Sequence, residues 1–258
     1  MLPFGRSYEE ITAAFRWQVP PAYNMAVDAC EKWARVEPDR PALIHVHADG
    51  SIDRWSHGRM AQTAHRLSNL LAARGVRRGD RVAILLPQSP ETAITHIAVY
   101  AMGAVALPLA DLFGVEALSY RLGDAGAKVV VTNGAGAAKI AEIRGLLTDL
   151  ESVLTVDGVA EGTEDLHRLL ERASDRFEPV ATRADDPALM IYTSGTTGPP
   201  KGALPAHRVL LGHVPGVQCA HEFTPQPGDL MWTPADWAWA GGLLNVLLPA
   251  LSLGVPVV

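Results

Sequence analysis

Short apolar runs alternate with helical segments between residues 81 and 156, and this alternation constrains the fold more than any other feature of the chain. Residues 81–86 are apolar after Arg81 and show no polar alternation, as is typical of a strand covered on both faces. A helix should follow, because Ser89, Pro90 and Glu91 supply a cap, a first-turn proline and an acid at the positive end of the helix dipole. Further strands are expected at 104–109, 128–132 and 152–156, with helices around 118–122 and at 139–147. Such strand–helix–strand units predict an α/β fold with largely parallel sheets.

The segment before residue 81 extends this pattern. Met25, Ala29 and Trp33 recur at a spacing of four and predict a helix, and residues 41–47 are predicted to form a strand. Ser56 can cap a further helix, whose apolar stripe and closing glycine are Met60, Ala64, Leu67, Leu71 and Gly75.

The segment after residue 156 changes character. Residues 157–186 contain nine acidic residues against four arginines, which favours a solvated surface helix flanked by loops. We treat residues 1–258 as one partial large domain and expect a subdomain break near 157–186. Residues 187–192 are predicted to begin a new strand.

Composition excludes several classes of protein. The 258 residues are 48% hydrophobic, enough for a sizeable core, and the net charge of −6 does not indicate a nucleic-acid partner. Cys30 and Cys219 lie far apart without metal-ligand spacing, which fits a reduced cytoplasmic compartment and no metal site. The first ten residues have no basic region followed by an apolar stretch, so we expect no signal peptide.

One apolar stretch is long enough to be mistaken for a membrane span. Residues 237–258 contain no charged side chain over 22 positions. Breaks within the stretch predict a buried helix followed by a strand, with no transmembrane segment; these breaks are Gly241, Gly242, Pro249, Gly254 and Pro256.

Residues 192–203 combine hydroxyl side chains, glycines, prolines and one lysine directly after a predicted strand. Glycines let a backbone approach a ligand closely and turn its N–H groups toward it. The hydroxyls of Thr193, Ser194, Thr196 and Thr197 add donors, and Lys201 adds a mobile charge suited to phosphate. The segment therefore predicts a polyphosphate-binding loop, although Ser/Thr/Gly-rich clusters also occur as ordinary surface turns. The kinase-type nucleotide loop does not fit, because Pro200 precedes the lysine and Gly202 follows it.

The order of these residues resembles a family signature. Residues 193–202 match every specified position of T-S-G-T-T-G-x-P-K-G, the signature of the acyl-adenylating superfamily, which includes acyl-CoA synthetases, firefly-type luciferases and peptide-synthetase adenylation domains. Residues 81–91 and 100–109 are similar to the first half of the family's nucleotide fold. The resemblance implies that ATP phosphates contact the whole loop, namely Thr193, Ser194, Gly195, Thr196, Thr197, Gly198, Pro199, Pro200 and Lys201.

A second segment, residues 232–242, is similar to the aromatic motif of acetyl- and medium-chain acyl-CoA synthetases. In those relatives an Asp-x-Gly-Trp string precedes a helix that lines the acyl pocket. Here Asp236 begins the string, Ala238 stands where the family has glycine, and Trp239 aligns with the family tryptophan. The resemblance implies an acyl-pocket role for Trp239 and, less directly, for Trp237, whereas tryptophans in general often serve core packing.

By resemblance, the chain is part of an AMP-forming acyl-CoA synthetase. Its substrates would be a small carboxylic acid, ATP with Mg²⁺, and coenzyme A, with Lys201 as the catalytic residue that contacts the β- and γ-phosphates. Two alternatives stay open: another acyl-adenylating enzyme such as a peptide-synthetase adenylation domain, or a non-catalytic nucleotide-binding fragment.

The resemblance also suggests a truncated chain. The family's metal-binding glutamate, ribose-binding aspartate, C-terminal catalytic lysine and small C-terminal domain all follow the aromatic motif. We therefore expect the 258 residues to be inactive in acyl-CoA formation by themselves.

Overall fold

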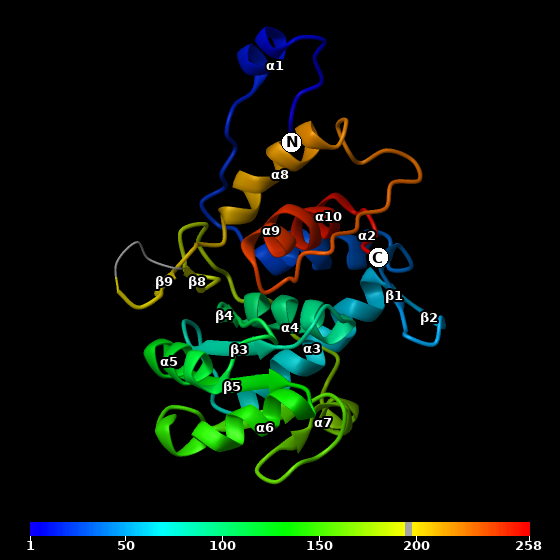
Figure 1. The fold of residues 1–258 in the computed structure, drawn as a ribbon. Helices are drawn as coiled ribbons and strands as arrows, with labels where there is room; N and C mark the ends of the chain where they lie inside the picture. The colour runs from blue at the N-terminus through cyan, green and yellow to red at the C-terminus, as the bar shows by residue number, and fades with distance from the viewer. Residues whose placement is uncertain (194–197) are drawn as a thin grey trace.

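Five parallel strands form the central sheet of the computed structural model, which describes residues 1–193 and 198–258 (Figure 1). Their order is β4-β3-β5-β6-β7, and every neighbouring pair is parallel. The strands are β3 (Arg81–Leu85), β4 (Val105–Pro108), β5 (Ala127–Thr132), β6 (Ser152–Thr155) and β7 (Glu164–Asp165). The predicted α/β class with a largely parallel sheet is confirmed.

Helices cover both faces of this sheet. They are α3 (His57–Ala73), α4 (Pro90–Ala101), α5 (Val115–Ala125) and α6 (Gly134–Ile143). In β3, Val82 and Ile84 pack in one core with α3 and α4, whereas Ala83 and Leu85 pack in a second core with α5 and α6. Successive side chains of a strand point to opposite faces, so a strand buried on both sides must be apolar at every position. This packing explains the unbroken apolar runs.

Local signals place the helix ends as expected. The Ser56 hydroxyl accepts a hydrogen bond from the Arg59 amide at 3.2 Å, and the Ser89 hydroxyl accepts one from the Thr92 amide at 3.3 Å. Gly103 has a φ of 66°, a left-handed conformation that is easiest for glycine. The chain therefore turns from α4 into β4 where the sequence predicts.

The remaining elements lie outside this sheet and its four helices. The antiparallel hairpin of β1 and β2 matches the predicted strand at 41–47. The elements outside the sheet and its four helices are α1 (Tyr8–Ala14), η1 (Val27–Glu31), α2 (Lys32–Val36), β1 (Pro41–Val46), β2 (Ile52–Ser56), η2 (Arg144–Leu146), α7 (Leu166–Arg172), β8 (Ile191–Thr193), β9 (Lys201–Ala203), α8 (Val209–Ala220), α9 (Ala240–Gly242), η3 (Leu243–Leu247) and α10 (Leu248–Leu253).

A second helical layer packs on α4, which is buried along its whole length. Helices α8, η3 and α10 share a core with η1 and the β1 strand (Figure 1). The long apolar stretch is thus a buried helical run over 240–253, ended by Gly254 with a φ of 72°. Among the described residues, no helix is both long and apolar enough to cross a bilayer.

Two predicted boundaries in these regions are wrong. Pro249 does not break the helical run, because it lies in the first turn of α10, where the hydrogen-bonding pattern changes from the π-helical turn η3. Residues 187–190 make only isolated bridges, Leu189 with Ala106 and Pro187 with Ala206, so β8 begins later than predicted at Ile191.

Residues 157–186 contain a short surface helix, as predicted. Helix α7 buries Leu166 and Leu170 and exposes its other face, and the two-residue strand β7 joins the edge of the main sheet beside β6. The subdomain break expected here stays a prediction.

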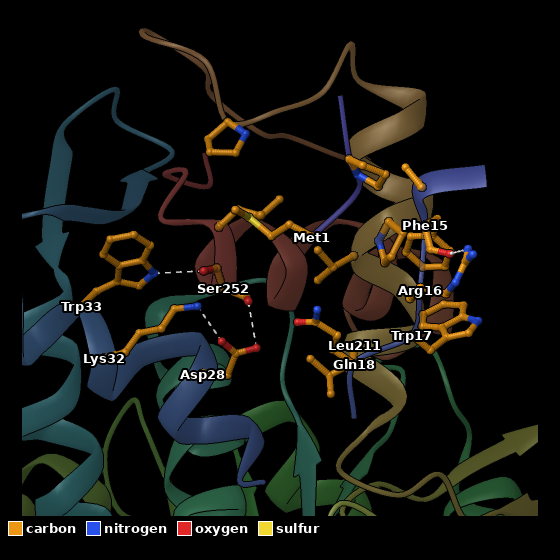
Figure 2. Close-up of a pocket in the computed structure, with 16 residues that line it drawn as sticks. Met1, Phe15, Arg16, Trp17, Gln18, Asp28, Lys32, Trp33, Leu211 and Ser252 are labelled. Carbon is orange, nitrogen blue, oxygen red and sulfur yellow. Dashed lines mark hydrogen bonds and ion pairs between the residues drawn. The ribbon is translucent and has the colours of Figure 1, made fainter. Parts of the chain in front are cut away.

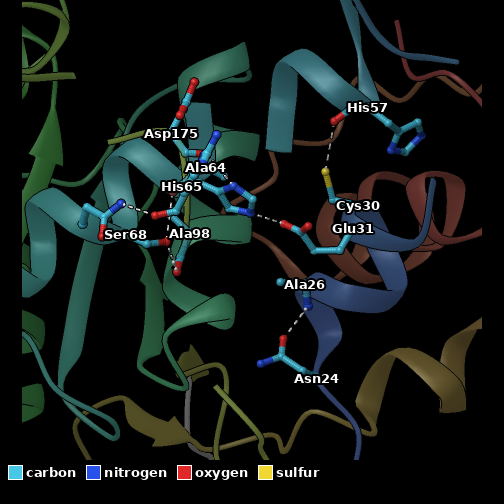
Figure 3. A network of polar contacts seen from close by, with 12 residues as sticks. Asn24, Ala26, Cys30, Glu31, His57, Ala64, His65, Ser68, Ala98 and Asp175 are labelled. Atoms are coloured by element: carbon cyan, nitrogen blue, oxygen red, sulfur yellow. Dashed lines mark hydrogen bonds and ion pairs between the residues drawn. The ribbon is translucent and has the colours of Figure 1, made fainter. Parts of the chain in front are cut away.

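An ion pair between Glu31 of η1 and His65 of α3 connects these two helices (Figure 3). His65 Nε2 lies 2.7 Å from a carboxylate oxygen of Glu31, which is 4% exposed, and His65 Nδ1 lies 2.9 Å from the carbonyl oxygen of Asp175. The Asp175 carbonyl oxygen can only accept, and an ionised Glu31 carboxylate accepts as well, so the two contacts fit an imidazolium that donates from both ring nitrogens. The hydrogen bond to Glu31 raises the pKa of His65 above its ordinary value.

We predict that His65→Gln removes a pH-dependent part of the stability. Because the folded-state pKa is raised, the stabilisation from His65 is complete below about pH 6.5 and is lost as the pH rises through the folded-state value. Urea unfolding should therefore show a larger difference between wild type and variant at about pH 6 than at about pH 8.

Three buried histidines contribute to the pH dependence of stability with the opposite sign. Because wild type and His65→Gln share them, their contribution cancels in the difference between the two proteins. Burial lowers the pKa of His57 to about 4, that of His96 to about 3 and that of His207 to about 4, so these residues disfavour folding below about pH 6.5. A difference that does not change with pH would contradict the imidazolium assignment.

Candidate functional site

The predicted phosphate loop connects the two strands of a hairpin. Strands β8 and β9 pair antiparallel, and Thr193 lies directly opposite Lys201 in the register. Both residues are exposed, and they stand where the loop leaves and re-enters the hairpin. The structure therefore brings together the first and last predicted phosphate contacts. The predicted contacts Ser194, Gly195, Thr196 and Thr197 lie outside the described residues.

Gly198 and Gly202 of the motif each require glycine, for different physical reasons. Gly198 has a φ of 85°, in the left-handed region that L side chains rarely adopt. Gly202 faces Tyr192 across the hairpin, and a Cβ there would lie 3.2 Å from Met190 and 3.3 Å from the Tyr192 ring. The first glycine allows the turn, and the second leaves room for the ring.

Helix α5 contacts the hairpin at both ends of the loop, which the sequence did not predict. The Tyr192 hydroxyl donates to the Asp124 carboxylate at 2.5 Å. The Tyr120 hydroxyl donates to the carbonyl oxygen of Pro200 at 3.0 Å. Burial and the hydrogen bond to Asp124 raise the pKa of Tyr192, so its phenol stays protonated and able to donate.

A guanidinium group lies between aromatic rings beside this hairpin. Arg121 stands 4.2 Å from the Phe113 ring centre and 5.7 Å from that of Tyr192, and it donates to the carbonyl oxygen of Ala117 at 3.0 Å. Within 1–193 and 198–258, no carboxylate forms an ion pair with it. The positive charge is therefore held by cation–π contacts.

The aromatic motif folds as a tight turn before α9. The Asp236 carboxylate accepts a hydrogen bond from the Ala238 amide at 2.9 Å, and burial followed by the nearby Asp111 raises its pKa. Ala238 is not among the residues of positive φ, so the departure from the family glycine strains nothing. Gly242 does require its identity, since a Cβ would lie 2.5 Å from the Ala235 carbonyl oxygen.

The two predicted acyl-pocket tryptophans have different surroundings. Trp239 caps α9, is 47% exposed and packs edge-on against Phe113 with ring centres 5.9 Å apart. Trp237 is 5% exposed and lines a cavity of about 260 Å³ together with Trp232. Their roles in acyl binding stay predictions.

A separate cavity of about 670 Å³ lies between residues 1–18 and helices α8 and α10 (Figure 2). Its polar part is Asp28, which accepts hydrogen bonds from Lys32, Ser252 and Tyr23. None of the predicted site residues lines it. Across the described part of the chain, no group of three or more His, Cys, Asp and Glu side chains is arranged to hold a metal ion.

Comparison with known proteins relates these features to a family. Residues 30–258 match the family described as AMP-binding enzyme. The chain is 29% identical over 241 residues to the mitochondrial acyl-coenzyme A synthetase ACSM3 of Homo sapiens, covering 91% of this chain and 41% of that protein. It is 29% identical over 268 residues to acetyl-coenzyme A synthetase of Escherichia coli (strain K12), covering 96% of this chain and 41% of that one.

A solved structure shows the same relationship in three dimensions. The crystal structure of an acyl-CoA synthetase from Brucella canis matches with a TM-score of 0.85 and 30% identity. The match covers 97% of this chain and 47% of that one. The chain thus spans about two fifths of the length of these two curated relatives.

We predict that Gly242→Ala destabilises the aromatic motif. The added methyl group would meet the backbone of Ala235 and Asp236, which cannot move aside as a flexible side chain could. Overpacking of this kind costs about 1–3 kcal/mol, measurable by urea unfolding.

The neighbouring glycine is a matched control. A Cβ at Gly241 meets nothing within 4 Å, and alanine favours a helix over glycine by up to about 1 kcal/mol. Gly241→Ala should therefore keep or raise the stability, and a Gly242→Ala variant as stable as Gly241→Ala would contradict the close backbone contact.

Proposed function

Because this chain belongs to the AMP-binding enzyme family, we propose that it carries the phosphate-binding part of an AMP-forming acyl-CoA synthetase. The substrates proposed are a small carboxylic acid, Mg-ATP and coenzyme A. The acid attacks the α-phosphorus of ATP to give an acyl-AMP and release pyrophosphate. The thiol of coenzyme A then attacks the acyl carbonyl, and AMP leaves.

The observation that carries this proposal is the pairing of Thr193 with Lys201 across the hairpin. It places a hydroxyl and an ammonium group at the two ends of a glycine-containing loop. Hydroxyls, backbone N–H groups and a lysine are the donors that phosphates accept from. The loop sequence thus supplies donors on a segment whose two ends are held by a β-ladder.

For this reaction the chain has to position the substrates and neutralise their negative charge. Carboxylate and ATP are both anions, and further negative charge develops on the leaving pyrophosphate, so donors aimed at that charge lower the barrier. Lys201 would neutralise the β- and γ-phosphates, while the Thr193 hydroxyl would donate to them. Mg²⁺ would enter with ATP as part of the substrate and would offset part of the phosphate charge.

We propose Trp239 as a wall of the acyl end of the site. It stands at the start of an apolar helical run, and its exposed ring is held by Phe113. An aromatic ring with one face against the protein and the other open can bound an apolar ligand.

The first test is Lys201→Ala. Loss of a charge-assisted contact should weaken Mg-ATP and Mg-pyrophosphate binding by the chain about tenfold or more, as measured by isothermal titration calorimetry. Lys201→Arg keeps the charge and should retain part of the affinity. Wild-type affinity in Lys201→Ala would show a surface lysine without a phosphate contact and would remove the support for the proposal.

The second test concerns the acyl end and uses isothermal titration of the chain with non-hydrolysable acyl-AMP analogues that carry acyl groups of increasing size. Trp239→Ala should shift the preference toward bulkier acids by about tenfold, because one methylene group in such a pocket is worth about 1–3 kcal/mol. Trp237→Ala is the comparison, since truncating this buried ring should cost about 3–5 kcal/mol of stability. An unchanged acid profile combined with lower stability in Trp239→Ala would show a packing residue.

A further inference from the structure

We propose that helix α5 positions the phosphate loop, with Tyr120 and Asp124 as the positioning residues. This inference rests on the proposed function and deepens it. Neither residue belongs to the loop motif, and both come from a helix that lies about 70 to 80 residues earlier in the chain.

The two hydrogen bonds hold opposite ends of the same loop. Asp124 accepts from Tyr192, the residue directly before Thr193, and Tyr120 donates to Pro200, the residue directly before Lys201. Tyr120 and Asp124 are four residues apart, so they lie on one face of α5. A single helix therefore contacts the residue next to each of the two proposed terminal phosphate contacts, through the side chain of Tyr192 and the backbone of Pro200.

The helix is a rigid support for these bonds. Leu118 and Leu122 of α5 are buried and share a core cluster with Tyr192. Tyr120 packs edge-on against Tyr192 with ring centres 6.1 Å apart. The helix ends at Gly126, whose φ of 58° is a left-handed cap. Because the helix cannot shift without disturbing the sheet core, it sets the position of the loop ends.

Arg121 adds a fixed positive charge to the same support. Its guanidinium group is held between Phe113 and Tyr192 by ring contacts and does not form an ion pair in the described part of the chain. A cation beside the loop favours an anionic ligand at any distance within about one Debye length, roughly 10 Å at moderate salt.

Such positioning should appear in phosphate binding. A loop with both ends fixed has less conformational entropy to lose when its donors gather around phosphate oxygens. Releasing one end restores that cost without removing a ligand contact. The affinity for Mg-ATP and Mg-pyrophosphate should therefore fall, while the fold remains.

The experiment compares Tyr120→Phe and Tyr192→Phe, which removes the hydroxyl bonded to Asp124, with wild type by isothermal titration of the chain with Mg-ATP and with Mg-pyrophosphate. Each variant should bind both about three- to tenfold more weakly, the effect of one hydrogen bond. Asp124→Glu keeps the acceptor and should recover part of the affinity. Circular dichroism and urea unfolding report the fold of each variant.

A matched control is available in the same chain. Tyr23 donates to Asp28 at 2.7 Å, a comparable tyrosine–aspartate bond outside the hairpin, so Tyr23→Phe should lower stability without changing either affinity. If Tyr120→Phe and Tyr192→Phe lose stability like Tyr23→Phe but bind like wild type, the inference is overturned and the proposed function stands. A wild-type chain that binds neither probe would overturn the proposed function, and the inference would fall with it.

Discussion

Burial of both faces of one parallel sheet is the constraint on which the site depends. Parallel strands end at a common edge, and ligands of open α/β sheets bind beyond that edge. The turn after β3 carries Gln88, whose side chain donates to the Ala235 carbonyl oxygen at 2.7 Å, and the turn after β4 carries Phe113. The bridge from Leu189 to Ala106 runs parallel to β4 and leads the chain into β8 at the same edge. Phe113 packs against Trp239 of the aromatic motif and against Arg121, which contacts the Tyr192 ring, so the aromatic motif and the β8–β9 hairpin are linked through Phe113 and Arg121.

Periodicity predicted the elements of the sheet because their burial is local in cause. The middle of a strand covered on both faces is apolar, and the Ser89 cap depends on an amide only three residues further along the chain. The sequence predictions fail where contacts with distant residues or a change in helical hydrogen bonding determine the local structure. Residues 187–190 have the composition of a strand, but their described ladder contacts are single bridges. Pro249 is tolerated because the helical run changes its hydrogen bonding at that point, and a sequence pattern does not contain that change.

In the candidate site, too, some features could be predicted from the sequence and others could not. The loop motif is contiguous, so its family resemblance could be seen in the sequence, and the match over residues 30–258 confirms that resemblance. The α5 contacts could not be seen, since Tyr120 and Asp124 are ordinary residues of a half-exposed helix until Tyr192 and Pro200 come beside them. The only sequence signal was the pair of polar residues four positions apart on one helix face. That signal is too common to predict a contact across about 70 residues.

An acid beside a phosphate loop needs a physical account, because a carboxylate repels phosphate. One carboxylate oxygen of Asp124 accepts a hydrogen bond from the Tyr192 hydroxyl. The pKa of Tyr192 is raised, so the phenol stays protonated and donates. Arg121 lies three residues earlier on α5, and its guanidinium group contacts the ring of the same tyrosine. The formal charges of Arg121 and Asp124 cancel, so these two residues together add no net charge beside the loop. Lys201 is then the formal charge that the described ends of the loop contribute, and under the proposed function phosphate would be attracted most strongly where the hairpin places that lysine.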